Sequence, residues 1–235
     1  PELKAYDPCF AYELAVITRH GIKEMFTDKK KLFYYITVGN QTYPMPEMPE
    51  GVEEGVLKGM YRYRKSEKDK KRKVHLFGSG AIMQEVLKAA ALLEEDYDTS
   101  VDIWSITSYK ALYDNAIDTE RENRLKAQLN KEPTYIEQCM EKEAGVFIAA
   151  LDYVKALPES VSQWFPGKLT SLGTDGYGRS ASVEELRGFF EVGFKDIAYA
   201  ALYDLTIQNK MTAGELKKAT EDLGIDPKKK NPRTS

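Results

Sequence analysis

The chain has 235 residues, of which 42% are hydrophobic and 30% charged, and its formal net charge is −3 at pH 7. This length suffices for one large domain, or for one domain and part of another. The slightly negative charge argues against a dedicated nucleic-acid-binding protein, and the absence of an apolar run of about 18 residues argues against a membrane span.

The first 49 residues are predicted to form the end of an α/β domain and a linker. Residues 10–26 predict a helix, with Asp7 as its N-cap and Pro8 in its first turn. Residues 32–38 are an apolar run without alternation, typical of a parallel strand that is buried on both faces. We expect no strand before this run, so its neighbours would come from outside the sequence. The prolines within residues 42–49 predict an extended linker.

Residues 50–235 alternate strands and helices. After a short helix near Val52, two strands at residues 60–64 and 74–77 are expected to pair as a hairpin around a charged turn at 67–72. The alternation that follows predicts a three-layer αβα fold with a mostly parallel sheet, in which residues 60–64 form the one antiparallel strand. The remaining strands are predicted at residues 101–107, 145–150 and 169–172, and the main helices at 81–95, 108–128, 133–140, 183–190, 197–208 and 213–223.

The loops that follow the parallel strands should meet at the carboxyl edge of the sheet, where open α/β sheets usually bind ligands. The turn at residues 78–80 could hold an anion on its backbone N–H groups, or it could be a plain strand-to-helix turn. The glycine-rich loop at residues 173–180 could approach a ligand closely or pack on a partner subunit. The candidates for lining this crevice are Gly78, Ser79, Thr107, Asp152, Thr174, Asp175, Tyr177 and Arg179.

The sequence offers no catalytic constellation, and we assign no catalytic, cofactor-binding or metal-binding residue. His20 and His75 have no acidic partner or second histidine at metal-ligand spacing, so both are expected to be packing or surface residues. The two cysteines, Cys9 and Cys139, are far apart, which indicates a reduced, cytoplasmic protein without a disulfide framework. A scaffold domain taken from a larger enzyme accounts best for these features.

Six short segments carry a family resemblance. They are Tyr6-Asp7-Pro8, Tyr34-Tyr35-Ile36-Thr37, the run YPMPEMPEG at residues 43–51, Gly78-Ser79-Gly80, the run GTDGYGRS at residues 173–180, and Asn231-Pro232-Arg233. In this order they resemble the last part of the homodimeric pyruvate dehydrogenase component of the pyruvate dehydrogenase complex. The resemblance implies a transketolase-like chain, with residues 1–49 as the end of the pyrimidine-binding middle domain plus linker. Residues 50–235 would be its C-terminal domain.

The resemblance also implies an activity that these residues would not carry alone. The parent enzyme would decarboxylate pyruvate on thiamine diphosphate with magnesium. Working as a homodimer, it would transfer the acetyl group to a lipoyl group on the partner acyltransferase. Its cofactor-binding and catalytic residues would lie before Pro1, so we expect this chain to be inactive and to bind neither cofactor. The turn after the last middle-domain strand would face the substrate channel, which makes Asn40, Gln41 and Tyr43 channel candidates, although the acidic residue common in that turn is absent here.

Two other functions stay open on the sequence alone. The chain could be a regulatory or interaction module that binds a small anion or a partner subunit at the carboxyl edge of the sheet. It could also be a free-standing nucleotide-binding α/β protein, which would fit the topology but lacks the glycine fingerprint. An enzyme fragment predicts no thiamine-dependent turnover, whereas a module predicts a ligand near residues 173–180.

Overall fold

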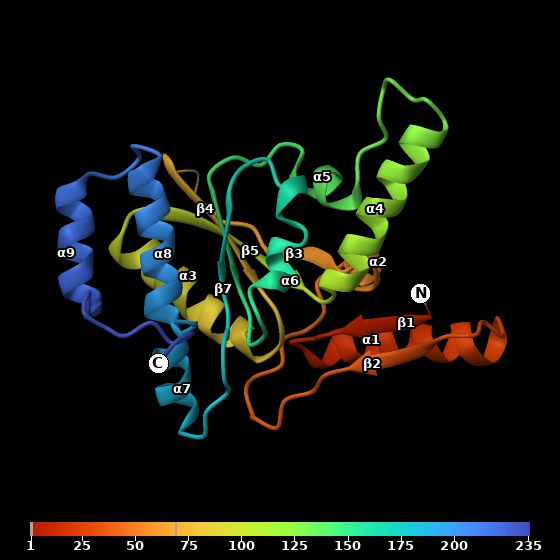
Figure 1. The fold of residues 1–235 in the computed structure, drawn as a ribbon, viewed down its shortest axis with the longest axis horizontal. Helices are drawn as coiled ribbons and strands as arrows, with labels where there is room; N and C mark the ends of the chain where they lie inside the picture. Colours follow the sequence, from red (N-terminus) through yellow and green to blue (C-terminus); the bar gives the residue numbers. More distant parts are fainter. Residues whose placement is uncertain (1, 69) are drawn as a thin grey trace.

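The computed structural model describes residues 2–68 and 70–235. Pro1 and Asp69, the latter within the predicted turn, lie outside the described residues. A small N-terminal unit contains β1 (Leu3–Tyr6), α1 (Ala11–Ile22), a π-helical turn (Lys23–Thr27) and β2 (Phe33–Ile36). A larger unit is built around a five-stranded sheet, and the N-terminal unit lies against one end of it (Figure 1).

The larger unit contains these elements. Its strands are β3 (Met60–Arg64), β4 (Arg72–Gly78), β5 (Thr99–Ile106), β6 (Val146–Ala150) and β7 (Leu169–Leu172). Its helices are α2 (Glu53–Lys58), α3 (Met83–Asp96), α4 (Tyr109–Leu125), α5 (Tyr135–Met140), α6 (Ala156–Glu159), α7 (Val183–Phe190), α8 (Phe194–Ile207) and α9 (Ala213–Leu223), with 3-10 turns at Gly80–Ile82 and Ser162–Trp164.

The N-terminal unit differs from the prediction in two ways. A strand does precede β2, because β1 pairs with it in parallel, with Leu3 opposite Phe33. The sequence of β1, LKAY, is too short and mixed to show a strand pattern. β2 is also not buried on both faces: Phe33 and Tyr35 are 57% and 60% exposed. α1 covers the other face, where the Tyr34 ring lies close to Gly21.

The N-cap of α1 was also predicted wrongly. The helix begins at Ala11, and its N-cap is Phe10 rather than Asp7. Glu13 supplies the capping, because its Oε2 accepts hydrogen bonds from the backbone N–H groups of Cys9, at 2.6 Å, and Phe10, at 3.1 Å. Asp7 is thereby left free to contact the larger unit. Residues 37–49 contain no helix or strand, as expected for the proline-rich segment, and its role as a linker between two domains stays a prediction.

The strand order in the large sheet is β3-β5-β4-β6-β7, with β3 antiparallel to β5 and all other pairs parallel. The predicted mostly parallel α/β fold with β3 as the antiparallel strand is therefore confirmed. The predicted hairpin of β3 and β4 is wrong, because β5 lies between them. The connection at residues 65–71 is longer than the two-to-five-residue loops that join most hairpins. Every residue of β5 is buried, as a central strand requires.

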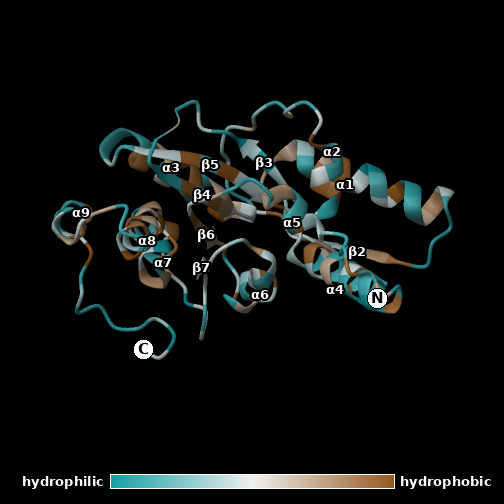
Figure 2. Cartoon of the chain, turned by 90° about the horizontal axis from the view of Figure 1, so that it is seen from above, coloured by the Kyte–Doolittle hydropathy of each residue, from teal (hydrophilic) through white to brown (hydrophobic). Residues whose placement is uncertain are grey.

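Helices cover both faces of the sheet, as Figure 2 shows from above. Alternate strand residues point to opposite sides. Leu76 joins a cluster with residues of α3 and α8, while Phe77 joins a cluster with residues of α4 and α5. Among the residues that the structure describes, none of the helices combines the length and apolar character needed to cross a membrane.

Candidate functional site

The large sheet has one position at which successive strands are added on opposite sides of β4. The chain leaves β4 to form β5 on one side and then crosses to form β6 on the other side. Ligands of open α/β sheets bind at such a switch point, outside the carboxyl ends of the strands. The loops that end here are residues 78–80 after β4, residues 107–109 after β5 and residues 151–153 after β6.

Asp7 of the N-terminal unit occupies this place. Its backbone N–H donates to the carbonyl oxygen of Thr107 at 2.8 Å, and its own carbonyl oxygen accepts from the N–H of Gly80 at 3.1 Å. The Thr37 hydroxyl donates to Asp7 Oδ1 at 2.5 Å. Gly80 has a φ of +48°, and a Cβ on it would lie 2.6 Å from the same oxygen. The turn, for which anion binding and a plain strand-to-helix connection were both open, therefore contacts a carboxyl group of its own chain.

The surroundings of Asp7 raise the pKa of its carboxyl group. Burial raises the pKa of Asp7, while hydrogen bonds from the hydroxyls of Thr37 and Ser79 lower it. The negative charges of Asp152 and Glu13 add to the rise. Burial is the largest of these effects, because removing a carboxylate from water penalises its charge.

The eight crevice candidates divide into two groups. Gly78, Ser79, Thr107 and Asp152 belong to the loops around Asp7 or act on its charge. The other four lie in the loop of residues 173–180, which contacts residues other than Asp7. The N–H of Thr174 donates to Tyr153, and Asp175 Oδ1 accepts from the N–H of Lys155. Tyr177 is 91% exposed, and Arg179 stacks on Phe189 and donates to the Ser235 carbonyl oxygen.

The three channel candidates lie in the turn that follows β2. Gln41 Oε1 accepts a hydrogen bond from Arg187 of α7 at 3.2 Å. Tyr43 donates its hydroxyl proton to the carbonyl oxygen of Cys9 at 2.8 Å. Asn40 is exposed. The turn is thus held by both units of the chain, and its role beside a substrate stays a prediction.

A buried carboxylate between the two units escaped sequence reasoning. Glu13 of α1 is fully buried, and its Oε1 accepts from the hydroxyls of Tyr61 in β3 and Ser105 in β5, each at 2.6 Å. No lysine or arginine forms an ion pair with Glu13 within residues 2–68 and 70–235. The bonds from Glu13 to the backbone of Cys9 and Phe10 are local, but its hydroxyl partners come from distant strands and could not be found from the sequence.

The prediction that the two histidines have no acidic partner is wrong for both. His20 Nε2 lies 3.5 Å from Glu24 Oε2, and His75 has two acidic neighbours. The fully buried imidazole lies with Nε2 3.7 Å from Glu143 Oε2 and with Nδ1 4.0 Å from Asp102 Oδ2. Parallel pairing of β4 and β5 places His75 opposite Asp102, which no local pattern indicates. Both ring nitrogens already have partners: Trp104 Nε1 donates to Nδ1 at 3.3 Å, and Nε2 lies 3.2 Å from the Ala144 carbonyl oxygen.

This histidine cluster does not fit a magnesium ion or a diphosphate bound through one. Asp102 Oδ1 accepts from Lys73 Nζ at 2.7 Å and from the N–H of Ser66 at 2.8 Å, and Glu143 pairs with Arg62. Magnesium needs carboxylate oxygens that are free to enter its octahedral shell. Asp102 Oδ2 accepts no hydrogen bond from the described residues, but it is buried and lies 3.9 Å from Arg62 Nη1. Lys73 and Arg62 therefore neutralise the two acids in place of a metal.

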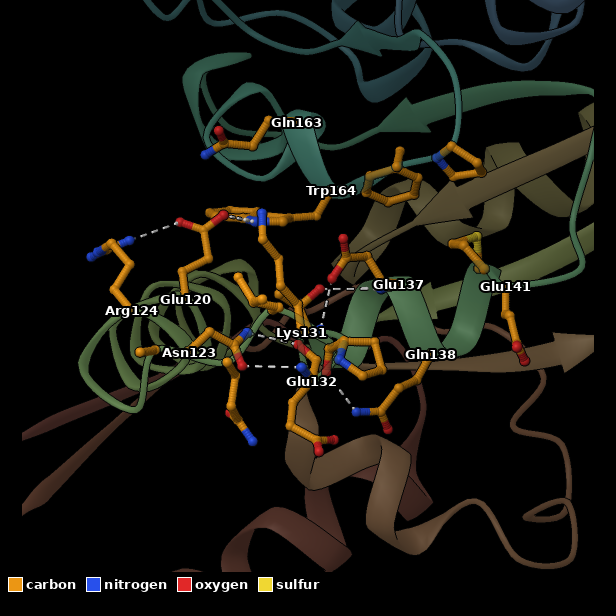
Figure 3. Close-up of a pocket in the computed structure, with 18 residues that line it drawn as sticks. Glu120, Asn123, Arg124, Lys131, Glu132, Glu137, Gln138, Glu141, Gln163 and Trp164 are labelled. Atoms are coloured by element: carbon orange, nitrogen blue, oxygen red, sulfur yellow. Dashed lines mark hydrogen bonds and ion pairs between the residues drawn. The ribbon is translucent and has the colours of Figure 1, made fainter.

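A hollow of about 980 Å³ opens at the far end of α4, between the loop to α5 and the 3-10 turn at Ser162–Trp164 (Figure 3). Trp164 Nε1 donates to Glu120 Oε1 at 2.8 Å, and the Asn123 amide clamps the loop through both backbone groups of Glu132. The lining mixes acidic, basic and amide side chains. Such a mixture selects no single class of ligand.

Two family models match the chain in succession. The one described as "Pyruvate dehydrogenase E1 component middle domain" matches residues 1–46, and the one described as "Transketolase-like TK C-terminal domain" matches residues 59–193. The pyruvate dehydrogenase E1 component of Pseudomonas aeruginosa is 42% identical over 99% of this chain, and that of Escherichia coli K12 is 40% identical over 99%. The chain spans about a quarter, 26%, of the length of these two relatives.

Solved structures resemble the fold. A transketolase from Pichia stipitis in complex with sedoheptulose-7-phosphate superposes with a TM-score of 0.61 at 14% identity, covering 90% of this chain and 26% of that chain. A split-gene transketolase, described as an inactive beta4 tetramer, gives a TM-score of 0.52 at 14% identity, covering 88% and 59%. At these identities the likeness concerns the fold alone. Together with the match over residues 59–193, it places the chain in the family of transketolase-like C-terminal domains.

Proposed function

We propose that the chain is the C-terminal part of a thiamine-diphosphate-dependent pyruvate dehydrogenase E1 component, in which these residues act as scaffold and interface. The observation that carries this proposal is the 42% identity over 99% of the chain to such a component. The parent would decarboxylate pyruvate and pass the acetyl group to a lipoyl group. Thiamine diphosphate and magnesium would be held by other parts of the parent, which agrees with the poor fit of the histidine cluster to a metal.

The proposed partners are a second copy of the parent chain and the lipoyl-bearing acyltransferase of the complex, in the cytoplasm. The exposed aromatic side chains of β2 support the presence of an interface. Parallel strands are normally covered on both faces, and two strands alone form a marginal sheet. The proposed division into residues 1–49 and 50–235 is supported by the extended segment at residues 37–49.

A graft tests the proposal. The 235 residues would replace the matching region of the Pseudomonas aeruginosa relative, and pyruvate-dependent reduction of an artificial electron acceptor would be measured with thiamine diphosphate and magnesium. We expect the graft to be active, and both the relative truncated before this region and the 235-residue chain alone to be inactive. A graft that dimerises like the relative but does not turn over pyruvate would contradict the proposal, as would turnover by the chain alone.

The structure does not favour an anion-binding regulatory module. The turn at residues 78–80, which was the candidate for receiving an anion, already receives Asp7. The loop at residues 173–180 is fastened to residues 153 and 155 and, through Gly176 and Arg179, to the end of the chain. An external anion would have to displace these contacts to bind there.

A further inference from the structure

The carboxyl edge of the sheet and the end of β2 both contact one residue, Asp7, through its backbone and its side chain. We propose that Asp7 is a latch: seated on the loops that follow β4 and β5, it holds the turn at residues 39–43 against the larger unit. Its release would open the crevice and loosen that turn in one movement. Asp7 is a positioning residue in this role.

The backbone of Asp7 joins it to two neighbouring strands. Its N–H is bonded to Thr107, directly after β5, and its carbonyl oxygen to Gly80, just after β4. A strand added to the sheet would form hydrogen bonds along a single neighbouring strand. Asp7 instead bonds to the residues that follow two different strands. Removing it would expose both strand ends at the switch point.

The side chain of Asp7 extends the contact to β2. Oδ1 accepts the Thr37 hydroxyl proton at 2.5 Å, and the Thr37 N–H donates to Tyr6, the residue before Asp7. The other side of the carboxyl group faces Gly80, where an added Cβ would lie 2.6 and 2.7 Å from the two oxygens. The carboxyl group is therefore enclosed between the end of β2 and the turn after β4.

The turn at residues 39–43 begins two residues after Thr37 and has two further attachments. Tyr43 is bonded to the carbonyl oxygen of Cys9, which lies two residues after Asp7, and Gln41 is bonded to Arg187. Two of the three attachments, through Thr37 and Cys9, depend on where the Asp7 segment sits. The bond from Arg187 is an exposed one and cannot hold the turn alone.

Hydrogen exchange of the 235-residue chain tests the latch, because the Gly80 amide is bonded to Asp7 and reports directly on its seating. In Asp7→Ala we expect the Gly80 amide and the amides of residues 39–43 to exchange roughly tenfold faster, the change expected from losing one or two hydrogen bonds. The amides of α9 should exchange as in the unmodified chain. Asp28→Ala, an exposed acid of the same unit, is the matched control and should change none of these rates.

Three further variants separate a latch from general destabilisation. Gly80→Ala should raise the same exchange rates by placing a Cβ against the carboxyl group. In the double variant, Asp7→Ala with Gly80→Ala, the increase in exchange rate should be smaller than the product of the two single increases. Asp7→Asn keeps an acceptor for Thr37 and should stay closer to the unmodified chain than Asp7→Ala. Unchanged exchange in Asp7→Ala, an equal rise in α9, fully multiplicative effects, or an Asn variant as fast as the Ala variant would each overturn the latch.

Discussion

Glu13 is a buried acid, and its hydrogen-bond partners within the described part of the chain are all neutral donors. Five donors approach its two oxygens: the N–H groups of Cys9 and Phe10, the hydroxyls of Tyr61 and Ser105, and the Cys9 thiol. Glu13→Gln would replace one acceptor by an amide donor that faces other donors. We expect the free energy of unfolding in urea to fall by about 2–4 kcal/mol, the usual cost of unsatisfied groups in a buried polar network.

Glu141 provides the matched control for this prediction, because it is exposed. Glu141→Gln should change the free energy of unfolding by less than about 0.5 kcal/mol. If Glu13→Gln had an equally small effect, the five donors around Glu13 would not form a stabilising network.

His75 should make stability depend on pH. Burial lowers its pKa, and the negative charges of Asp102 and Glu143 oppose that effect only partly. A histidine whose folded pKa lies below its unfolded value of about 6.5 stabilises the fold above that pH and loses this contribution as the pH falls. The free energy of unfolding should therefore decrease from pH 7 to pH 5, and His75→Gln should flatten this decrease. An unaltered pH profile in His75→Gln would disprove the assignment.

Some of the candidate site could be predicted residue by residue. Ser79, Thr107 and Asp152 follow parallel strands, so their position at one edge of the sheet follows from the strand assignment alone. Asp7 could not be assigned to that edge, because it comes from a different unit and its sequence context predicts a helix cap. Contacts with residues far away in the sequence place Asp7 at the edge of the sheet rather than at the helix N-cap.

At the scale of elements, α8 contains an acid in an unfavourable place. Asp196 lies in the first turn, where the helix dipole would favour a charge, yet burial raises the pKa of Asp196 to about 6. Since the unfolded value is about 3.9, the ionised form destabilises the fold at neutral pH. Allowing for partial exposure, Asp196→Asn should raise the free energy of unfolding by about 1–2 kcal/mol at pH 8.

The gain in Asp196→Asn should disappear below about pH 4, where the acid is protonated in both states. Chemical denaturation at the two pH values measures this difference. Asp222→Asn, an exposed position on α9, is the control. A gain that persists at low pH would show that charge is not its cause.

Element types were easier to predict than their pairing. α7, α9, β3 and β7 begin and end at the predicted residues. Hydrophobic spacing and turn residues are local signals, and they identify helices and strands well. Strand order is set by contacts between distant residues, so the place of β5 between β3 and β4 was not visible. The strand β1 was missed for a similar reason, since only pairing with β2 makes it a strand.

At the scale of the whole molecule, the N-terminal unit presents an uncovered aromatic face. Phe33 and Tyr35 point to the same side of β2 and are both more than half exposed. Contiguous apolar surface of this kind promotes association. We expect Phe33→Ser with Tyr35→Ser to lower the binding of a hydrophobic dye and any self-association seen by sedimentation.

Tyr177→Ser is the matched control for this face, because Tyr177 is an isolated aromatic side chain that is 91% exposed. It should leave dye binding and sedimentation unchanged. If the double variant on β2 behaved like this control, the face would have no part in association.

Gly80 has a consequence for how sequences of this family vary together. The carboxyl group of Asp7 fills the space that a side chain at position 80 would need, and the backbone there adopts a positive φ. A relative that carries a side chain at the equivalent of Gly80 should therefore also have replaced the acid at the equivalent of Asp7. The two positions, far apart in the chain, should then appear as a correlated pair in an alignment.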